Sequence, residues 1–467
     1  MTQQRANSDP TGALTAADLE RLSKEFAANP SNRLMQNAVA KTTIDDVALD
    51  RDVVTSIDHT VSNLLTDRKV TNQEKSGRCW LFAGVNLLRT GAAGKLNVKD
   101  FEFSQNYLLF WDKMEKANHF LEAIIETAGR DVDDRTVAHL LADPIGDGGQ
   151  WNMFVALVRK HGLVPKSAMP ETHSSSNTHA MNRSLTQLLR KAARDLRDEA
   201  ASGVKPDGLR ESKETILQAA HRMLSIHLGT PPETFFWQWT DEDKGFHRDG
   251  TLTPLEFAER YVTIPLDDYV CLVHDPRATS EPGRTYTVEY LGNVVGAPPV
   301  TYLNVEIDQL RELAMRTILD TAEPVWFGCD TGKMSNTDLG VWDAALYDYG
   351  SVYSTDLSMP KADRLVHHDT LMTHAMLFIG VDVVDGTPRK WRVENSWGDE
   401  RGDKGLWTMN DGWFGEHVFE IAVRRELLPK KLQKALAADP IVLPAWDPMG
   451  ALAHRSHGER LSGVSAA

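Results

Sequence analysis

The sequence predicts an α+β protein, in which a helical half is followed by a β-rich half. Apolar residues recur at helical spacing between residues 61 and 165. From residue 268 onward the apolar spacing shifts toward two, which is typical of strands. The stretch between the two halves, residues 166–260, is charge-rich and amphipathic, and we expect it to be a helical insertion. A chain of 467 residues is long enough for a large core and more than one domain.

The first 60 residues are expected to form an arm with one or two helices. Thr15 or Asp18 can cap a helix over residues 16–26. Residues 61–165 are expected to form the helical half. Its helices are predicted to begin at Cys79, to run over residues 101–120, and to run over residues 152–161, where Gly162 ends the last one.

The predicted insertion contains a linker-like stretch at residues 174–177 and two long helices at 185–201 and 209–228. Trp237 and Trp239 are expected to pack this insertion against the body. Residues 261–425 are predicted to form a β-barrel-like half, and residues 426–467 a C-terminal arm and tail. Strands are expected at residues 269–274, 285–290, 325–329, 375–384, 390–394, 406–409 and 418–423, with one helix at 307–321.

Composition excludes several classes of protein. A net charge of −15 argues against non-specific nucleic-acid binding, and the longest apolar run, residues 375–381, is too short to span a bilayer. Residues 1–7 lack the apolar core of a signal peptide. Three cysteines do not make a disulfide framework, so we expect a cytoplasmic protein. His367 and His368 lack a second cluster with ligand spacing, and no metal or organic cofactor is implied.

Four residues predict a catalytic site. Cys79 stands where a helix is expected to begin, and unpaired N–H groups there favour a thiolate. His374 can take the proton from the thiol, and Asn395 can fix the orientation of the imidazole. Gln73, six positions before Cys79 (79 minus 73), can stabilise a developing oxyanion together with the Cys79 backbone N–H. Trp397 can shield the hydrogen bond between His374 and Asn395.

The chain resembles the papain-like cysteine peptidases and, within them, the bleomycin hydrolase and aminopeptidase C family. The segments that carry this resemblance run across most of the chain, at residues 77–83, 147–151, 324–330, 372–376, 391–398 and 443–453. Ser76 stands where secreted members have a disulfide-forming cysteine, which suits a cytosolic enzyme. His374 follows Cys79 by 295 residues (374 minus 79), against about 130–150 in papain, so the insertion accounts for the excess.

The resemblance implies a homohexamer, an aminopeptidase that acts on peptide substrates, and a C-terminal arm that lies in the cleft and limits it. In the family pattern, the terminal carboxylate of the arm pairs with the free amino group of the substrate. This chain continues for fourteen residues after Ala453 (467 minus 453), so Ala453 has no carboxylate. We expect the enzyme to trim this tail; the alternatives are that the tail bends away from the cleft or plugs it.

The function expected is hydrolysis of peptides from the N-terminus through a thioester, with bleomycin-like amides as further substrates. An acyltransferase or transglutaminase-like enzyme would use the same Cys79, His374 and Asn395, with an amine resolving the thioester. The third reading is an inert oligomeric scaffold, in which Cys79 is a buried apolar residue.

Overall fold

A computed structural model describes residues 12–65 and 68–453 of the chain, which divide into two compact units. The smaller unit consists of the chain up to residue 57 together with residues 345–358, and the larger one contains all other residues. None of the helices in the described ranges is long and apolar enough to cross a membrane. The division into five segments expected from the sequence stays a prediction.

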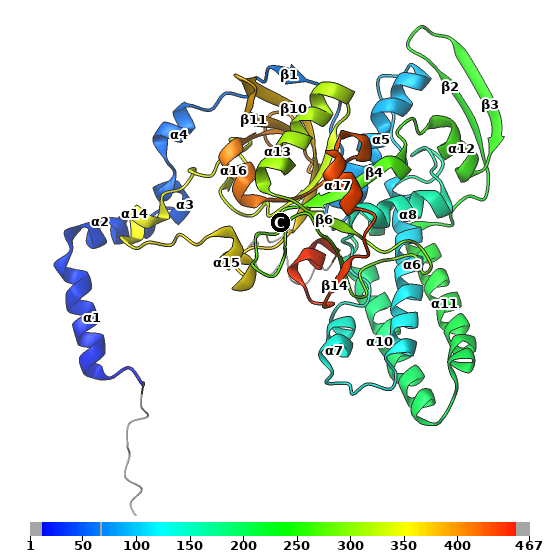
Figure 1. Ribbon diagram of the computed structural model, residues 1–467, viewed down its shortest axis with the longest axis horizontal. Coiled ribbons are helices and arrows are strands. Elements are labelled where there is room, and N and C mark those ends of the chain that lie inside the picture. The colour runs from blue at the N-terminus through cyan, green and yellow to red at the C-terminus, as the bar shows by residue number, and fades with distance from the viewer. Residues whose placement is uncertain (1–11, 66–67, 454–467) are drawn as a thin grey trace, which may run out of the picture. The chain divides into compact units, whose positions relative to one another are not determined.

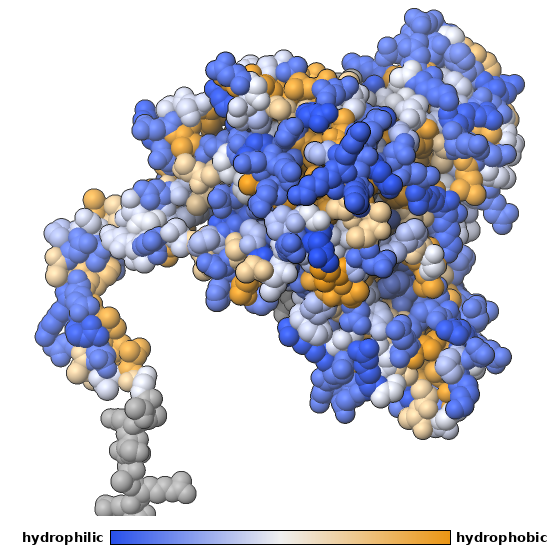
Figure 2. Space-filling model, viewed as in Figure 1, coloured by the Kyte–Doolittle hydropathy of each residue, from blue (hydrophilic) through white to orange (hydrophobic). Residues whose placement is uncertain are grey.

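The smaller unit is helical, and its first helix has an exposed apolar face. Thr15 caps this helix and Asp18 completes a capping box, as expected from the sequence. Leu19, Leu22 and Phe26 are 52%, 44% and 46% exposed, and Figure 2 shows hydrophobic side chains along α1. The helices of this unit are α1 (Ala16–Ala28), α2 (Pro30–Val39), α3 (Ile44–Ala48), α4 (Arg51–Thr55) and α14 (Tyr349–Tyr353).

The helical half contains the helix that begins at Cys79, as predicted. Its members are α5 (Cys79–Leu96), α6 (Gln105–Glu126), α7 (Arg135–Ala142) and α8 (Trp151–His161) (Figure 1). The helix predicted from residue 101 begins later, because the Ser104 hydroxyl accepts from the Tyr107 N–H and caps α6 there. Gly162 ends α8 with a φ of +70°, and a side chain at this position would collide with the Pro254 backbone.

The insertion consists of α9 (His173–Ser176), α10 (His179–Ala201), α11 (Pro206–Leu228), a hairpin of β2 (Phe235–Thr240) and β3 (Phe246–Leu252), and α12 (Pro254–Tyr261). The linker predicted at residues 174–177 is wrong, because Thr172 and Ser175 form a capping box that holds a helical turn. The hairpin carries the two expected tryptophans, and Trp239 Nε1 donates to the Leu96 carbonyl at 3.0 Å. The aromatic residues therefore pack the insertion against the end of α5, as expected.

The β-rich half is one sheet of twelve strands. Its strand order runs from β14 through β5, β6, β4, β13, β7, β10, β11, β12 and β9 to β8, with β1 pairing β10. Among the described residues, β14 and β8 are the two ends of this order and do not pair with each other. The sheet is therefore not the closed barrel suggested by the prediction of a β-barrel-like half. The strands are β1 (Asn63–Leu64), β4 (Tyr269–Val273), β5 (Thr285–Val288), β6 (Tyr302–Asn304), β7 (Val325–Cys329), β8 (Ser335–Asn336), β9 (Val341–Trp342), β10 (His374–Val384), β11 (Thr387–Glu394), β12 (Leu406–Asn410), β13 (Val418–Arg424) and β14 (Ile441–Leu443).

Both faces of the central strand β10 are buried, which explains its continuous apolar sequence. Ala375, Leu377 and Ile379 belong to the core shared with α5 and α8. Met376 and Phe378 belong to a second core with α13 (Ile307–Arg316) and α16 (Asp411–His417). The helix predicted over residues 307–321 is present in two parts. Its α-helical part, α13, ends at Arg316, and a π-helical turn follows over Thr317–Thr321.

A buried ion pair joins the two halves near the candidate site. Arg89 of α5 donates to Glu394, the last residue of β11, at 2.9 Å, and both side chains are about 5% exposed. Asn86, one turn earlier on α5, donates to the same carboxylate oxygen at 2.8 Å. Because Asn395 follows Glu394 directly, this cluster fixes the helix of Cys79 relative to the strand that precedes Asn395.

We predict that Glu394→Gln lowers the stability of the protein by about 3 kcal/mol, because it leaves the buried Arg89 guanidinium without a counter-charge. The measurement is a shift in the denaturant midpoint and the apparent melting temperature. Asp195→Asn is the control, since Asp195 pairs with Lys191 on an exposed helix surface and its loss should change stability far less. Equal shifts in the two variants would contradict the proposed role of the buried pair.

Candidate active site

Cys79 is the first residue of α5 and is 4% exposed. The N-cap residue Arg78 makes no side-chain cap hydrogen bond, and the N–H groups of the first turn point toward the start of the helix. The residue before it is held firmly: Arg78 is fully buried and forms a bidentate ion pair with Glu171, at 3.0 and 2.9 Å. The helix end therefore offers Cys79 a positive potential, which favours the thiolate.

His374 and Asn395 are brought together by the hairpin of β10 and β11. The register pairs Leu377 with Glu394, so the first residue of β10 and the residue after β11 lie at the same end of the hairpin. His374 Nε2 lies 2.9 Å from Asn395 Oδ1. The ring of Trp397 packs against the imidazole, with 4.9 Å between the centroids, and the shielding expected of it stays a prediction.

The hydrogen bonds of Asn395 decide the tautomer of the imidazole. Asn395 Oδ1 also accepts from the Ser396 backbone N–H at 2.7 Å, which identifies this atom as the oxygen. His374 Nε2 must then donate, because a carbonyl oxygen only accepts. In the neutral ring Nδ1 is consequently the acceptor, and it can take a proton from a thiol.

Burial lowers the pKa of His374 to about 4, although the hydrogen bond to Asn395 acts in the opposite direction. The imidazole is thus a neutral base at physiological pH unless a negative charge forms beside it. The prediction from the sequence is that a thiolate at Cys79 supplies this charge, and a thiolate–imidazolium pair would compensate for the desolvation of both groups.

Gln73 is tied to the segment that contains Asn395. Its backbone N–H donates to the Ser396 carbonyl at 2.8 Å, and its Oε1 accepts from the Ser396 hydroxyl at 2.7 Å. Its Nε2 donates to the Ser76 carbonyl at 2.5 Å, and the same nitrogen carries a second N–H. The oxyanion role expected for Gln73 stays a prediction. Ser396 is a site residue that the sequence did not single out.

Asp147 is a second residue whose importance the sequence did not reveal. Its fully buried carboxylate accepts from the Gly77 N–H at 3.0 Å, two residues before the nucleophile. It also accepts from Thr178 and Asn182 of the insertion and pairs with the buried Lys113 at 2.7 Å. The donors named here come from three separate parts of the chain, namely Gly77, Lys113 and the start of α10. Asp147 thus connects the loop before Cys79, α6 and the insertion.

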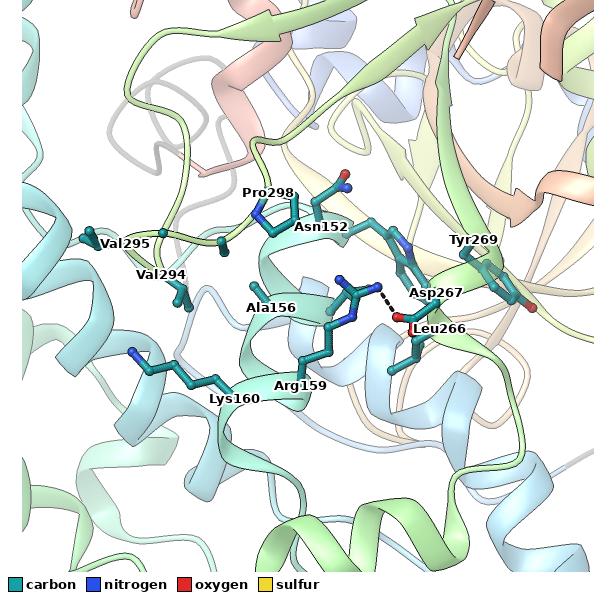
Figure 3. Close-up of a pocket in the computed structure, with 14 residues that line it drawn as sticks. Asn152, Ala156, Arg159, Lys160, Leu266, Asp267, Tyr269, Val294, Val295 and Pro298 are labelled. Carbon is teal, nitrogen blue, oxygen red and sulfur yellow. Dashed lines mark hydrogen bonds and ion pairs between the residues drawn. The ribbon is translucent and has the colours of Figure 1, made fainter. Parts of the chain in front are cut away.

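A surface pocket of about 390 Å³ lies beside the helical half, between α8 and residues 266–269 and 294–298. Figure 3 shows an ion pair between Arg159 and Asp267 among its lining residues. Cys79, His374, Asn395 and Gln73 do not line it, so the candidate active site lies elsewhere. Within the described ranges, no group of three His, Cys, Asp or Glu side chains is arranged to hold a metal ion.

The model of the Peptidase C1-like family matches residues 13–450. The chain belongs to the Peptidase C1-like family. Human bleomycin hydrolase is 41% identical to this peptidase over 453 residues, which cover 95% of this chain and 99% of the human one. Aminopeptidase C of Listeria monocytogenes is 41% identical over 440 residues, or 94% and 99% of the two chains. The crystal structure of PepW from Lactobacillus rhamnosis superimposes with a TM-score of 0.92 at 42% identity, covering 94% and 99%.

These similarities confirm the family resemblance and the α+β fold predicted from the sequence. Because nearly the whole length of each chain aligns, the insertion and the β-rich half of this peptidase belong to an architecture that the relatives share. The tail over residues 454–467, for which trimming is expected, lies outside the described residues and outside the family match.

The lowered pKa of His374 predicts a pH-dependent stability. The unfolded chain takes up a proton on this residue below about pH 6.5, whereas the folded protein does so only below about pH 4. Its contribution to stability is therefore complete above pH 6.5 and is lost as the pH falls toward 4. We expect Cys79→Ala, which has no thiolate, to lose more stability over this range than the double variant Cys79→Ala/His374→Gln.

The measurement is denaturant unfolding of both variants between pH 4 and 7. His274, whose burial also lowers its pKa to about 4, contributes equally to both and cancels in the difference. Parallel pH profiles of the two variants would show that the folded protein does not hold His374 in its neutral form.

Proposed function

We propose that this peptidase is a cysteine-type aminopeptidase that hydrolyses peptides from the N-terminus through a thioester acyl-enzyme. The observation that supports this most directly is the hydrogen bond from His374 Nε2 to Asn395, which leaves Nδ1 as the base for a thiol at a helix start. The relatives named aminopeptidase C and bleomycin hydrolase support the same reading, and bleomycin-like amides are further candidate substrates.

In the proposed reaction, His374 Nδ1 takes the proton of Cys79, and the thiolate attacks the carbonyl carbon of the first peptide bond. The N–H of Cys79 and the Gln73 amide stabilise the oxyanion. The imidazolium gives its proton to the departing amine as the C–N bond breaks. Water, deprotonated by the same imidazole, then attacks the thioester and releases the amino acid.

We assign to the C-terminal arm the role of restricting cleavage to the amino end of the substrate. Its last described segment, the 3-10 helix Pro448–Ala453, is buried from Met449 onward. The Leu452 carbonyl lies so close to Gly148 that a Cβ there would be 2.0 Å away. The arm thus occupies the glycine loop beside the nucleophile helix and leaves little length for residues before the scissile bond.

We also propose a cytoplasmic homohexamer that works without metal or organic cofactor. The exposed face of Leu19, Leu22 and Phe26 on α1 supports assembly, since an unpartnered apolar helix face is suited to contact another subunit. A net charge of −15 supports the expectation that nucleic acid is not a partner.

We predict that peptides with a free amino terminus are cleaved at least a hundredfold faster, in kcat/KM, than the same peptides carrying an N-acetyl group. The reason is that an acetyl group extends the substrate into the space that the arm occupies. The measurement is release of a fluorogenic leaving group from matched free and acetylated substrates, with Cys79→Ala as the control for contaminating peptidases. Equal rates on both substrates would contradict the aminopeptidase assignment.

Product analysis in the presence of added amines separates hydrolysis from acyl transfer. Free amino acid as the main product supports the peptidase, whereas amide products at millimolar amine would favour the acyltransferase reading.

A further inference from the structure

The C-terminal arm is joined to the sheet before it reaches the glycine loop. Strand β14 pairs in parallel with β5, with Leu443 opposite Val288, and Figure 1 labels β14 close to the red end of the chain. The chain then turns at residues 444–447, where the Asp447 N–H donates to the Pro444 carbonyl at 2.8 Å. The segment Pro448–Ala453 follows this turn directly.

The far end of this segment rests against the glycine loop that borders the nucleophile. A Cβ at Gly148 would lie 2.0 Å from the Leu452 carbonyl oxygen. The same loop packs on the residue after Cys79, because a Cβ at Gly149 would lie 2.5 Å from the Trp80 ring. Any displacement of Leu452 would therefore change the space next to the nucleophile.

Asp447 fixes the start of the segment through a bidentate ion pair. Its Oδ2 accepts from Arg277 Nη1 at 3.0 Å, and its Oδ1 accepts from Nη2 at 2.9 Å. Both side chains are nearly buried, at 12% and 7% exposed. Oδ1 also accepts from the Met449 N–H at 2.9 Å, so the same carboxylate orients the first turn of the segment.

Arg277 is itself held rigidly by the body of the protein. Its guanidinium donates to Asp275 through Nε at 2.9 Å and through Nη2 at 2.7 Å. Asp275 is 3% exposed and accepts from Ser280 at 2.6 Å, while its backbone N–H donates to Asn304. These contacts fix Asp447 relative to the residues that follow β4.

Other side-chain contacts around residues 446–449 are weaker. The Met449 carbonyl accepts from Tyr302 and Gln150 at 3.3 and 3.4 Å, near the limit for a hydrogen bond. Arg135 lies over the Trp446 ring at 4.0 Å. A charge-assisted bidentate pair is stronger than either of these contacts, so among them it contributes most to holding residues 446–449 in place.

We propose that Arg277 and Asp447 are positioning residues that form a latch, which sets how far the C-terminal arm reaches along the glycine loop and thereby determines the specificity for free amino termini. This inference rests on the proposed aminopeptidase function. Only five positions separate Asp447 from Leu452 (452 minus 447), so the segment has little slack to absorb a loss of the latch. With the latch open, the arm lifts from Gly148 and longer or blocked peptides enter.

The test measures one ratio, kcat/KM for the N-acetylated peptide divided by kcat/KM for the free peptide. Asp447→Asn keeps the side-chain shape and the contact with Met449 but removes the negative charge. Arg277→Lys keeps the positive charge but removes the planar guanidinium that makes the bidentate contact. We expect the ratio to rise at least tenfold in both variants. Gly148→Ala, which drives Leu452 off the loop directly, should raise the ratio in the same way with the latch intact.

Glu323→Gln is the matched control, because Glu323 forms a comparable paired contact with Arg424 elsewhere on the sheet, with Nε to Oε2 at 2.8 Å. Its ratio should equal that of the wild type. A ratio that rises equally in this control, or stays unchanged in folded Asp447→Asn and Arg277→Lys proteins, overturns the latch. If Asp447→Asn does not fold, Arg277→Lys decides alone. A wild type that cleaves both peptides equally well refutes the proposed function instead.

Discussion

The register of the hairpin between β10 and β11 is the constraint on which the site depends. Side chains alternate along a strand, so a slip of one residue would turn His374 to the other face of the sheet. Ala375, Leu377 and Ile379 on one face and Met376 and Phe378 on the other specify this register through two separate apolar cores. The hydrogen bond between His374 and Asn395 is the consequence, because both residues lie at the same end of the hairpin.

Buried ion pairs, rather than disulfides, connect the segments around the nucleophile. Arg78 pairs with Glu171, Lys113 with Asp147, and Arg89 with Glu394, all with at least one side chain largely withdrawn from water. Ser76 stands where secreted papain-like enzymes have a cysteine, and its hydroxyl accepts from Arg78 Nε at 2.8 Å. Such pairs add little net stability, but each is costly to break, so they hold the loops around Cys79 in one geometry.

The parts of the site that sequence reasoning could predict are those with a local signal. Cys79 begins a helix, as predicted. The apolar run after His374 predicted a strand over 375–384, and the structure starts β10 one residue earlier, at His374. Asp147 could not be found in this way, because its donors, among them Gly77 and Asn182, are far apart in the chain.

The differences between the predicted and the observed fold also arise where the sequence gives only a weak signal. In β2 the half-buried aromatic residues Phe235, Trp237 and Trp239 alternate with exposed residues, and the hairpin lacks the long apolar run that identified the other strands. Whether the sheet closes depends on how its edge strands β14 and β8 end, and these are only three and two residues long. The late start of α6 depends on the hydroxyl of Ser104, which competes successfully with the helical propensity of the residues before it.

The central claim is that the neutral imidazole of His374 ionises the thiol of Cys79. The most direct measurement is the rate of alkylation of each cysteine by iodoacetamide as a function of pH, read by mass spectrometry. Burial raises the pKa of Cys271 and Cys329, so these two serve as internal references. The account predicts that Cys79 reacts fast well below pH 8 and that His374→Gln moves this reactivity to higher pH. Alkylation of Cys79 that is no faster than that of Cys271 or Cys329 would contradict it.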